Sequence, residues 1–332
     1  MPMSRVTLDA QGFEVEEQAV APRRVLLSAS ALDRLADLGG VESPAAQMAT
    51  TSVSVESLGD RLGTLADREA PTTAPDGGPE PHADAAQHDE EPDLDAVLAG
   101  AGLVADGEPT ETGRAVLDVW HRPALAVELE MLLATRHGRV RARSWHRNLD
   151  TWVVCLSSAD GRTFELTWCA VDDWWLELGR VAWVDPQRFS PPDEPADTLP
   201  DAIETPWELL LATGEAVDRN RVELVDQLVA DYAGRTTAGH SVQSLVPAAD
   251  SDVRTWHVAL ERMSRGRLHA AVLARSQRGR PGAGIIEWVL FPDGWRSLTP
   301  FKRDGWNMVR IERKGPQDLG RDLAVLAAEL TS

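Results

Sequence analysis

The side chains that most often carry chemistry are sparse in this sequence, and their spacing argues against a metal centre. There are two cysteines and eight histidines. No Cys-x-x-Cys pair occurs, and no two histidines stand four residues apart, as they would on one face of a zinc-binding helix. His82 and His88 lie in an acidic stretch and indicate adventitious metal binding at most. We therefore expect neither a resident metal nor another cofactor.

Short motifs of nucleophilic and phosphate-transfer enzymes are also missing. Neither G-x-S-x-G nor G-x-x-x-x-G-K-[ST] occurs. The glycine-rich run at 279–284 joins two predicted strands, so we interpret it as a hairpin loop and not as a phosphate site at a helix N-terminus. Asp172 and Asp173 would point about 100° apart on a helix, and they are better explained as first-turn acids that complement the helix dipole. The sequence predicts a binding protein, not an enzyme.

Charge restricts the partners that we expect. The 332 residues carry a formal net charge of −20, which disfavours nucleic acid and anionic membranes because either needs a basic face. No stretch approaches the roughly 18 apolar residues of a membrane span, so no membrane insertion is expected. The N-terminus lacks the apolar core of a secretory signal, and Cys155 and Cys169 are interpreted as buried reduced thiols. These features predict a cytoplasmic protein.

Composition divides the chain into five segments. Residues 1–40 predict a strand and a helix, in which Ser30 and Asp33 have capping-box spacing. Residues 41–92 form an acidic, proline-rich insertion without apolar periodicity, which predicts disorder. Residues 93–185 form a first α/β half, 186–204 a proline-rich connector, and 205–332 a second half with several helices and a C-terminal helix.

Alternation of apolar and charged residues predicts the strands of the first half. Apolar side chains at every second position from 125 to 133 share one face, whereas Glu128 and Glu130 share the other. Arg141 and Arg143 of the next strand would meet these glutamates. A second hairpin and a short helix complete a four-stranded meander over 124–180.

The second half repeats landmarks of the first at similar spacing. These are Trp145, Asp150, Trp152 and Asp160-Gly161 in the first half, and Trp288, Asp293, Trp295 and Asp304-Gly305 in the second. A helix closes each set. The repeat predicts an α/β (α+β) protein with two similar halves, each an antiparallel β-meander with flanking helices, related by a pseudo-two-fold axis.

Several phrases of the sequence resemble the EspG family, the secretion-associated proteins of actinobacterial type VII (ESX) secretion. RVLLSASALDRLADLGG at 24–40 is similar to that family's first strand and helix. DLDAVLAGAGLV at 93–104, with the later PALAVELEMLLA, is similar to its passage into the first sheet. VRIERKGPQDLGRDLAVLAAEL is similar to its last strand and helix. The resemblance covers about 24–40 and 93–332.

This resemblance implies an EspG-like fold and a non-enzymatic cytosolic chaperone. Such proteins bind the apolar helical tip of an export substrate, so the implied partner is a helical secreted protein of the PPE-like or WXG type. The resemblance also places partner contacts in the loop between the first two strands of the meander, here Arg136, His137 and Arg139, and in the sheet and helices of the second half.

The stretch WVLFPDGWRSLTPFKRDGW at 288–306 combines aromatic and basic side chains, which are enriched at protein interfaces. We interpret Trp288 as core. The candidate partner contacts here are Trp295, Phe301, Lys302, Arg303 and Trp306. A different interpretation stays open at this level, namely an acidic immunity or regulatory protein that blocks a basic protein partner. The sequence leaves the substrate's identity and self-association open.

Overall fold

The computed structural model describes residues 7–8, 14–15, 23–43, 93–135, 138–185, 199–275 and 281–331. The helices are α1 (Ala29–Gly39), α4 (Leu94–Gly100), α5 (Glu111–His121), α6 (Trp174–Ala182), α7 (Trp207–Asp218), α8 (Glu223–Asp231), α9 (Asp250–Arg262) and α10 (Asp318–Thr331). Short two-residue strands pair as β1 (Thr7–Leu8) with β2 (Glu14–Val15) and as β4 (Val104–Ala105) with β5 (Glu108–Pro109).

One antiparallel sheet of twelve described strands organises the molecule. In chain order they are β3 (Arg23–Ser28), β6 (Leu125–Thr135), β7 (Gly138–Leu149), β8 (Trp152–Ser158), β9 (Thr163–Ala170), β10 (Ala202–Pro206), β11 (Thr237–Gly239), β12 (Val246–Pro247), β13 (Gly266–Arg275), β14 (Pro281–Phe291), β15 (Gly294–Arg303) and β16 (Trp306–Lys314). Their spatial order is β12-β11-β10-β16-β15-β14-β13-β6-β7-β8-β9-β3. The meander predicted over 124–180 is therefore present as β6 to β9 and α6.

The strand order repeats outward from the central β6–β13 pair. On one side the sheet runs β6-β7-β8-β9 and then returns to the earlier strand β3, and on the other it runs β13-β14-β15-β16 and then returns to β10. A helix follows each meander, α6 after β9 and α10 after β16. This connectivity is what two similar halves require, while a geometric two-fold relation between them stays a prediction.

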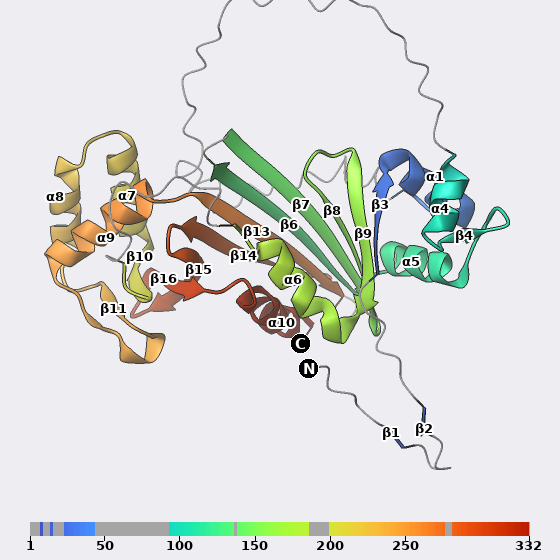
Figure 1. Cartoon of the computed structure of the whole chain (residues 1–332). Helices are drawn as coiled ribbons and strands as arrows, with labels where there is room; N and C mark the ends of the chain where they lie inside the picture. The colour runs from blue at the N-terminus through green and yellow to red at the C-terminus, as the bar shows by residue number, and fades with distance from the viewer. Residues whose placement is uncertain are drawn as a thin grey trace, which may run out of the picture.

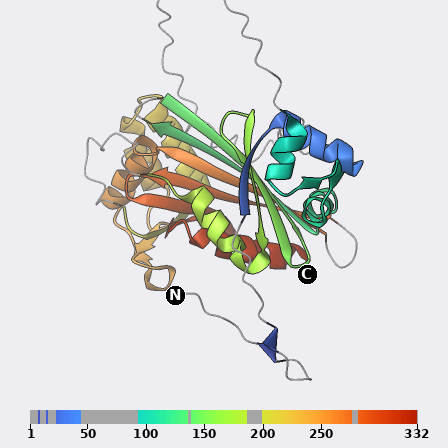
Figure 2. The ribbon, with the colours of Figure 1, turned by 45° about the vertical axis from the view of Figure 1, so that its right-hand side comes forward.

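The helices cover the sheet unevenly (Figure 1). The group α1, α4 and α5 packs at the β3 end and the group α7, α8 and α9 at the other end, while α6 and α10 lie against the middle. Figure 2 shows α6 crossing the strands, with α10 close to it. No described helix is long and apolar enough to cross a membrane.

Register shows that the repeated tryptophans do not occupy equivalent positions. Trp288 is opposite Leu268, which is opposite Met131, so its side chain lies on the α6 and α10 face. Trp145 is opposite Glu128, one residue out of phase with that set, and it joins the cluster of α1, α4 and α5. Trp145 and Trp288 therefore hold equivalent places in the spacing pattern but lie on opposite faces of the sheet. A shift of one residue in the pairing of two strands turns every side chain of a strand to the other face.

Local chemistry explains most element boundaries, with one correction. The N-cap of α1 is Ser28, whose hydroxyl accepts a hydrogen bond from the Ala31 amide at 3.1 Å, so the predicted cap at Ser30 is wrong by two residues. Gly40 ends the helix in the left-handed conformation that glycine adopts without strain. The predicted glutamate–arginine contacts occur in part: Arg141 pairs with Glu130, whereas Glu128 pairs with Arg147 at 3.1 Å.

The predicted insertion at 41–92 and connector at 186–204 lie mostly outside the described residues, so those boundaries stay predictions. The glycine-rich run at 279–284 is described only from Pro281, where β14 begins opposite Arg275. Its last four residues therefore belong to a strand and not to the hairpin loop that the sequence predicts.

Candidate functional site

The predicted partner-contact residues fall at two distant places. Arg139 is exposed near the start of β7, while Arg136 and His137 lie outside the described residues. The β6–β7 turn lies at the end of the sheet where β15 begins, because Leu133 is opposite Gly266, Gly266 opposite Leu290 and Leu290 opposite Trp295. Phe301 and Arg303 lie six and eight residues farther along β15 than Trp295, about 20 to 26 Å along the strand at roughly 3.3 Å per residue, and Trp306 is opposite Arg303. The structure does not bring the two sets together.

Trp295 is a core residue, which corrects its assignment as a partner contact. Its side chain is 2% exposed, and its indole Nε1 donates a hydrogen bond to the carbonyl of Ala182, at the end of α6, at 2.7 Å. Its ring centre lies 6.2 Å from that of Trp288, which is fully buried as predicted. A partner cannot reach either indole in this conformation.

The remaining four residues surround the β15–β16 hairpin and are accessible. Lys302 is exposed, whereas Phe301, Arg303 and Trp306 are half-buried. The hairpin turns at Asp304 and Gly305, both with positive φ, as the Asp-Gly pair predicts. Aromatic and cationic side chains are therefore presented together at this hairpin.

Sequence inspection missed three residues of the same surface. Glu204 of β10 is 3% exposed and accepts from Arg303 Nη1 at 2.6 Å and from Arg310 Nε at 2.9 Å. The guanidinium of Arg235 lies 4.8 Å from the ring centre of Trp306. The alternation of side chains along β16 could have indicated Arg310, because it lies four residues after Trp306 and therefore on the same face of the strand. No local signal pointed to Arg235 or Glu204, because both are far from the hairpin in sequence.

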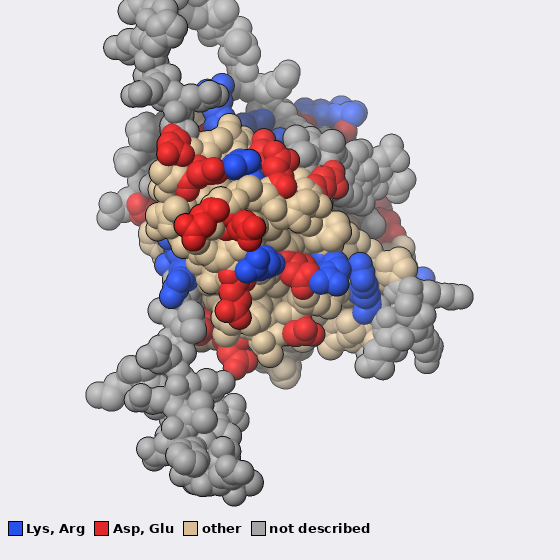
Figure 3. Space-filling view, turned by 90° about the vertical axis from the view of Figure 1, so that its right-hand side faces the viewer, with Lys and Arg blue, Asp and Glu red and all other residues tan. Residues whose placement is uncertain are grey.

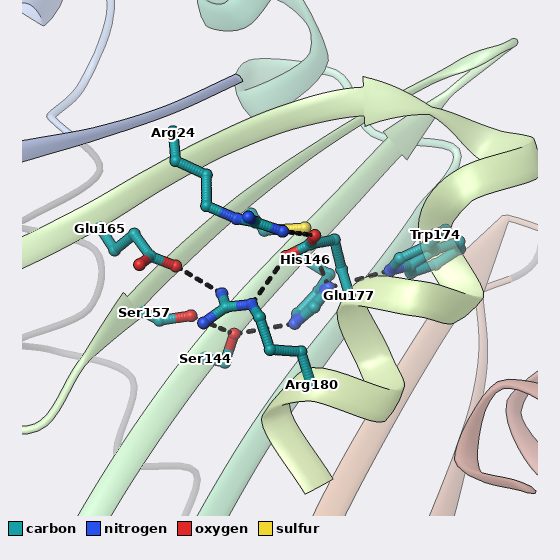
Figure 4. A network of polar contacts seen from close by, with 9 residues as sticks. Arg24, Ser144, His146, Ser157, Glu165, Trp174, Glu177 and Arg180 are labelled. Atoms are coloured by element: carbon teal, nitrogen blue, oxygen red, sulfur yellow. Dashed lines mark hydrogen bonds and ion pairs between the residues drawn. The ribbon is translucent and has the colours of Figure 1, made fainter. Parts of the chain in front are cut away.

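A second polar cluster lies between α6 and the sheet (Figure 4). His146 is fully buried on β7, and its Nδ1 accepts from the indole Nε1 of Trp174 at 2.8 Å. Its Nε2 lies 2.7 Å from the hydroxyl of Ser144, which in turn lies 2.8 Å from that of Ser157. Beside them Glu177, 1% exposed, pairs with Arg24 and with Arg180. The cluster joins α6 to strands β3, β7 and β8.

The Ser144–His146 pair has the wrong proton arrangement for a nucleophile and its base. An indole N–H can only donate, so Nδ1 of His146 must be unprotonated and Nε2 must carry the proton. Nε2 then donates to Ser144 and cannot take its proton. Burial, with a smaller effect of Arg147, lowers the pKa of His146 to about 3, so the ring stays neutral. This pair fits a structural role.

Both cysteines lie near this cluster as buried free thiols, in agreement with the prediction from the sequence. Burial raises the pKa of Cys155 well above its ordinary value and that of Cys169 to about 12. Cys155 Sγ lies 3.0 Å from His146 Nδ1. Thiols of such high pKa are poor nucleophiles.

A cleft of about 470 Å³ lies beside the same cluster, between α6 and the open ends of β6 to β9. Ser144, Ser157 and Arg180 are among its polar lining residues, and Leu129 and Trp183 are among its apolar ones.

Charged side chains elsewhere on the described surface are mixed in sign. On the α1, α4 and α5 end, acidic and basic side chains are interspersed without a continuous basic patch among the described residues in view (Figure 3).

A solved structure shares this architecture along nearly its whole length. It is that of the Mycobacterium tuberculosis type VII secretion system chaperone EspG5 in complex with the PE25–PPE41 dimer. The TM-score is 0.55, and the match covers 93% of this chain and 97% of that chain. This chain has an EspG-like fold. Sequence identity is 11%, and no protein-family model and no curated protein matches.

The EspG-like fold confirms the fold class predicted from the sequence, a mixed α+β protein built on a large antiparallel sheet. At 11% identity the likeness concerns the path of the chain and not its side chains. Partner-contact residues therefore have to be argued from this molecule's own surface.

Proposed function

We propose that this protein is a chaperone of type VII secretion that binds a helical export substrate. One observation carries the proposal: the fold matches, over 93% of this chain, a chaperone whose structure was solved with its PE25–PPE41 partner bound. The proposed partner is a PPE-like or WXG-type helical-hairpin protein, and the proposed place of action is the cytoplasm, where such a substrate would be held before export.

A non-enzymatic role follows within the same proposal. Burial lowers the pKa of both His146 and His257 and keeps their rings neutral, and His146 presents a proton, not a lone pair, to Ser144. The two thiols are inaccessible and weakly acidic. These groups stabilise the packing of α6 on the sheet, so we assign function to exposed surface and not to a reaction centre.

We assign the substrate contact to the β6–β7 turn with Arg136, His137 and Arg139. Among these, Arg139 is described, and it is exposed at an end of the sheet. A turn that joins two long central strands at an end of the sheet can contact a partner without disturbing the core. Charged groups at such a contact determine orientation and association rate more than total affinity.

Co-expression tests the proposal. The tagged chain is produced together with each helical-hairpin protein encoded beside it, and complexes are resolved by size-exclusion chromatography with light scattering. We expect a one-to-one complex with one of them. Arg139→Glu should weaken that complex by about tenfold through charge reversal, whereas Arg162→Glu, on the exposed β8–β9 turn, should not.

A chain that remains alone with every candidate would refute the chaperone assignment. Capture of a basic, non-helical protein with an affinity that falls steeply with salt would instead support the acidic immunity or regulatory role. Equal binding by Arg139→Glu and wild type would remove the β6–β7 turn from the interface but leave the assignment intact.

A further inference from the structure

A single buried carboxylate organises the surface around the β15–β16 hairpin. Glu204 is the charged group beneath it, and two guanidiniums, those of Arg303 and Arg310, bind its two oxygens. Both arginine side chains remain about one third exposed, at 37% and 35%. Each guanidinium has five N–H donors, so a carboxylate shared by two of them leaves donors directed to solvent.

Aromatic rings hold these cations in place. Two guanidiniums lie near the Phe301 ring, with Arg310 5.2 Å and Arg303 5.9 Å from its centre. The Trp306 ring carries Arg235 at 4.8 Å and packs edge-on against Tyr232 at 5.9 Å. A guanidinium near an aromatic ring loses conformational freedom before a ligand arrives, while its N–H edge stays available for a planar oxyanion.

Positive charge exceeds negative charge at this hairpin, although the whole chain is strongly acidic. Arg235 is exposed, and among the described residues it has no carboxylate within ion-pairing distance. Of the acidic residues of the hairpin, Asp304 lies in the turn and Glu312 pairs with Lys314. With Glu204 already occupied by two arginines, Arg235 has no internal counter-charge in the described part of the chain.

Glu204, Phe301, Arg303, Trp306 and Arg310 lie on the sheet face opposite α7 and α9, whereas Lys302 is opposite Asn307 and lies on the α7 face. Ile203, Val309 and Ile311 point to the core beneath those helices, and Glu204 and Arg310 alternate with them, so they point the other way. Helix α10 packs on β13 and β14, farther along the sheet (Figure 1). Access to the hairpin surface is therefore from solvent.

We infer that this surface, formed by Arg235, Phe301, Arg303, Arg310 and Trp306, binds an acidic segment of a partner protein that carries two or more carboxylates beside an apolar side chain. The carboxylates fit the N–H edges of Arg235, Arg303 and Arg310, and the apolar side chain fits the half-buried rings of Phe301 and Trp306. This inference rests on the proposed function only for the identity of the partner protein. The surface at the β15–β16 hairpin is separate from the β6–β7 turn to which the substrate contact is assigned.

Direct binding of a defined peptide tests the inference with the full chain. The probe is a fluorescein-labelled peptide Gly-Glu-Glu-Leu-Glu-Glu-Gly, titrated by fluorescence anisotropy, with the glutamine version as its control. We expect saturable binding of the glutamate peptide alone, weakening as salt rises from about 50 to about 200 mM. Arg235→Gln should weaken binding by about tenfold, because it removes a charge-assisted contact, whereas Lys302→Gln, on the opposite face of the sheet, should leave it unchanged.

Two further variants separate recognition from folding. Glu204→Gln removes the internal competitor for Arg303 and Arg310 and should tighten the peptide, an effect that a purely structural role would not produce. Arg114→Gln with Arg162→Gln removes two exposed cations far from the hairpin and should leave binding unchanged. Native tryptophan fluorescence of each variant confirms that it is folded.

Three results would overturn the inference: no saturable binding of the glutamate peptide, equal binding by Arg235→Gln and wild type, or tighter binding of a labelled oligothymidylate, which would assign the surface to phosphate. The peptide assay contains no secreted protein. Its failure is therefore separate from a failure of the chaperone assignment, which co-expression alone decides.

Discussion

Two buried histidines make the stability of this protein depend on pH in a range where few other groups titrate. Burial lowers the pKa of His146 to about 3 and that of His257 to about 4, from an ordinary value of 6.5. His257 lies between Thr213, at 2.7 Å from Nδ1, and Thr205, at 3.2 Å from Nε2. The Thr213 hydroxyl also donates to the Leu209 carbonyl, so it accepts from a neutral ring. The Trp174 N–H at Nδ1 disfavours an added proton on His146, and burial disfavours one on His257.

The sign and size of the effect follow from proton linkage. Below pH 6.5 the unfolded chain binds protons at both histidines while the folded chain does not, so the free energy of unfolding falls as pH falls. Each histidine contributes about 1.4 kcal/mol per pH unit between 6.5 and its folded pKa. At pH 5 the loss is about 2 kcal/mol per histidine, or about 4 kcal/mol in all, a large part of a typical stability of about 5–15 kcal/mol.

Urea unfolding followed by tryptophan fluorescence at about pH 8 and about pH 5 measures this loss. His257→Gln cannot take the proton, so the variant should lose only about 2 kcal/mol between the two conditions. His240→Gln is the matched control, because the His240 side chain is 99% exposed, and it should show the full loss. Asp95 and Asp160, whose pKa values are lowered by hydrogen bonds to Arg34 and to backbone amides, add their own losses only below about pH 4.

The reasoning is refuted if wild-type stabilities at the two pH values agree within about 1 kcal/mol, or if His257→Gln loses as much as wild type. The first result would mean that the unfolded chain or a relaxed native state keeps the histidines in a similar environment. The second would assign the pH dependence to other groups.

Other expected outcomes follow from individual contacts. Ser28→Ala should lower the free energy of unfolding by about 1 kcal/mol through loss of the α1 cap, whereas Ser30→Ala should change it little; urea midpoints compare the two. Trp288→Ala should cost about 3–5 kcal/mol in the same assay because the indole is 0% exposed, and a loss under about 1 kcal/mol would contradict its core role. Cys155 and Cys169 should resist a thiol reagent at about pH 8 until denaturant is added, and rapid labelling of the native protein would contradict their burial.

Local sequence patterns were sufficient for the individual elements. Alternation over 125–133 predicts β6, the Asp304-Gly305 pair predicts the last hairpin, and leucines at helical spacing predict α10. These predictions hold because strand phase, turn conformation and helical periodicity depend on neighbours within a few residues. The wrong prediction of the α1 cap is an error of only two residues. Both Ser28 and Ser30 are suitable N-cap residues, and the helix begins directly after Ser28.

Long-range packing decided the rest. Trp295 is buried because the end of α6 supplies its hydrogen-bond acceptor from more than a hundred residues away. Trp145 and Trp288 share a spacing pattern but lie on opposite faces, because cross-strand register determines the face of each side chain. Glu204 and Arg235 join the hairpin surface only through the pairing of β10 with β16 and the approach of α8.

The sequence by itself determined the composition of each element and the acidity of the chain, and it predicted two α/β halves. Only the tertiary structure decided that the halves join edge to edge through β6 and β13, and that the candidate residues separate into a core pair, a β6–β7 turn and a cationic hairpin. The physical reason is that periodicity tells which side of an element is apolar but not which distant element will cover it. That choice depends on register and packing between segments that the chain brings together only on folding.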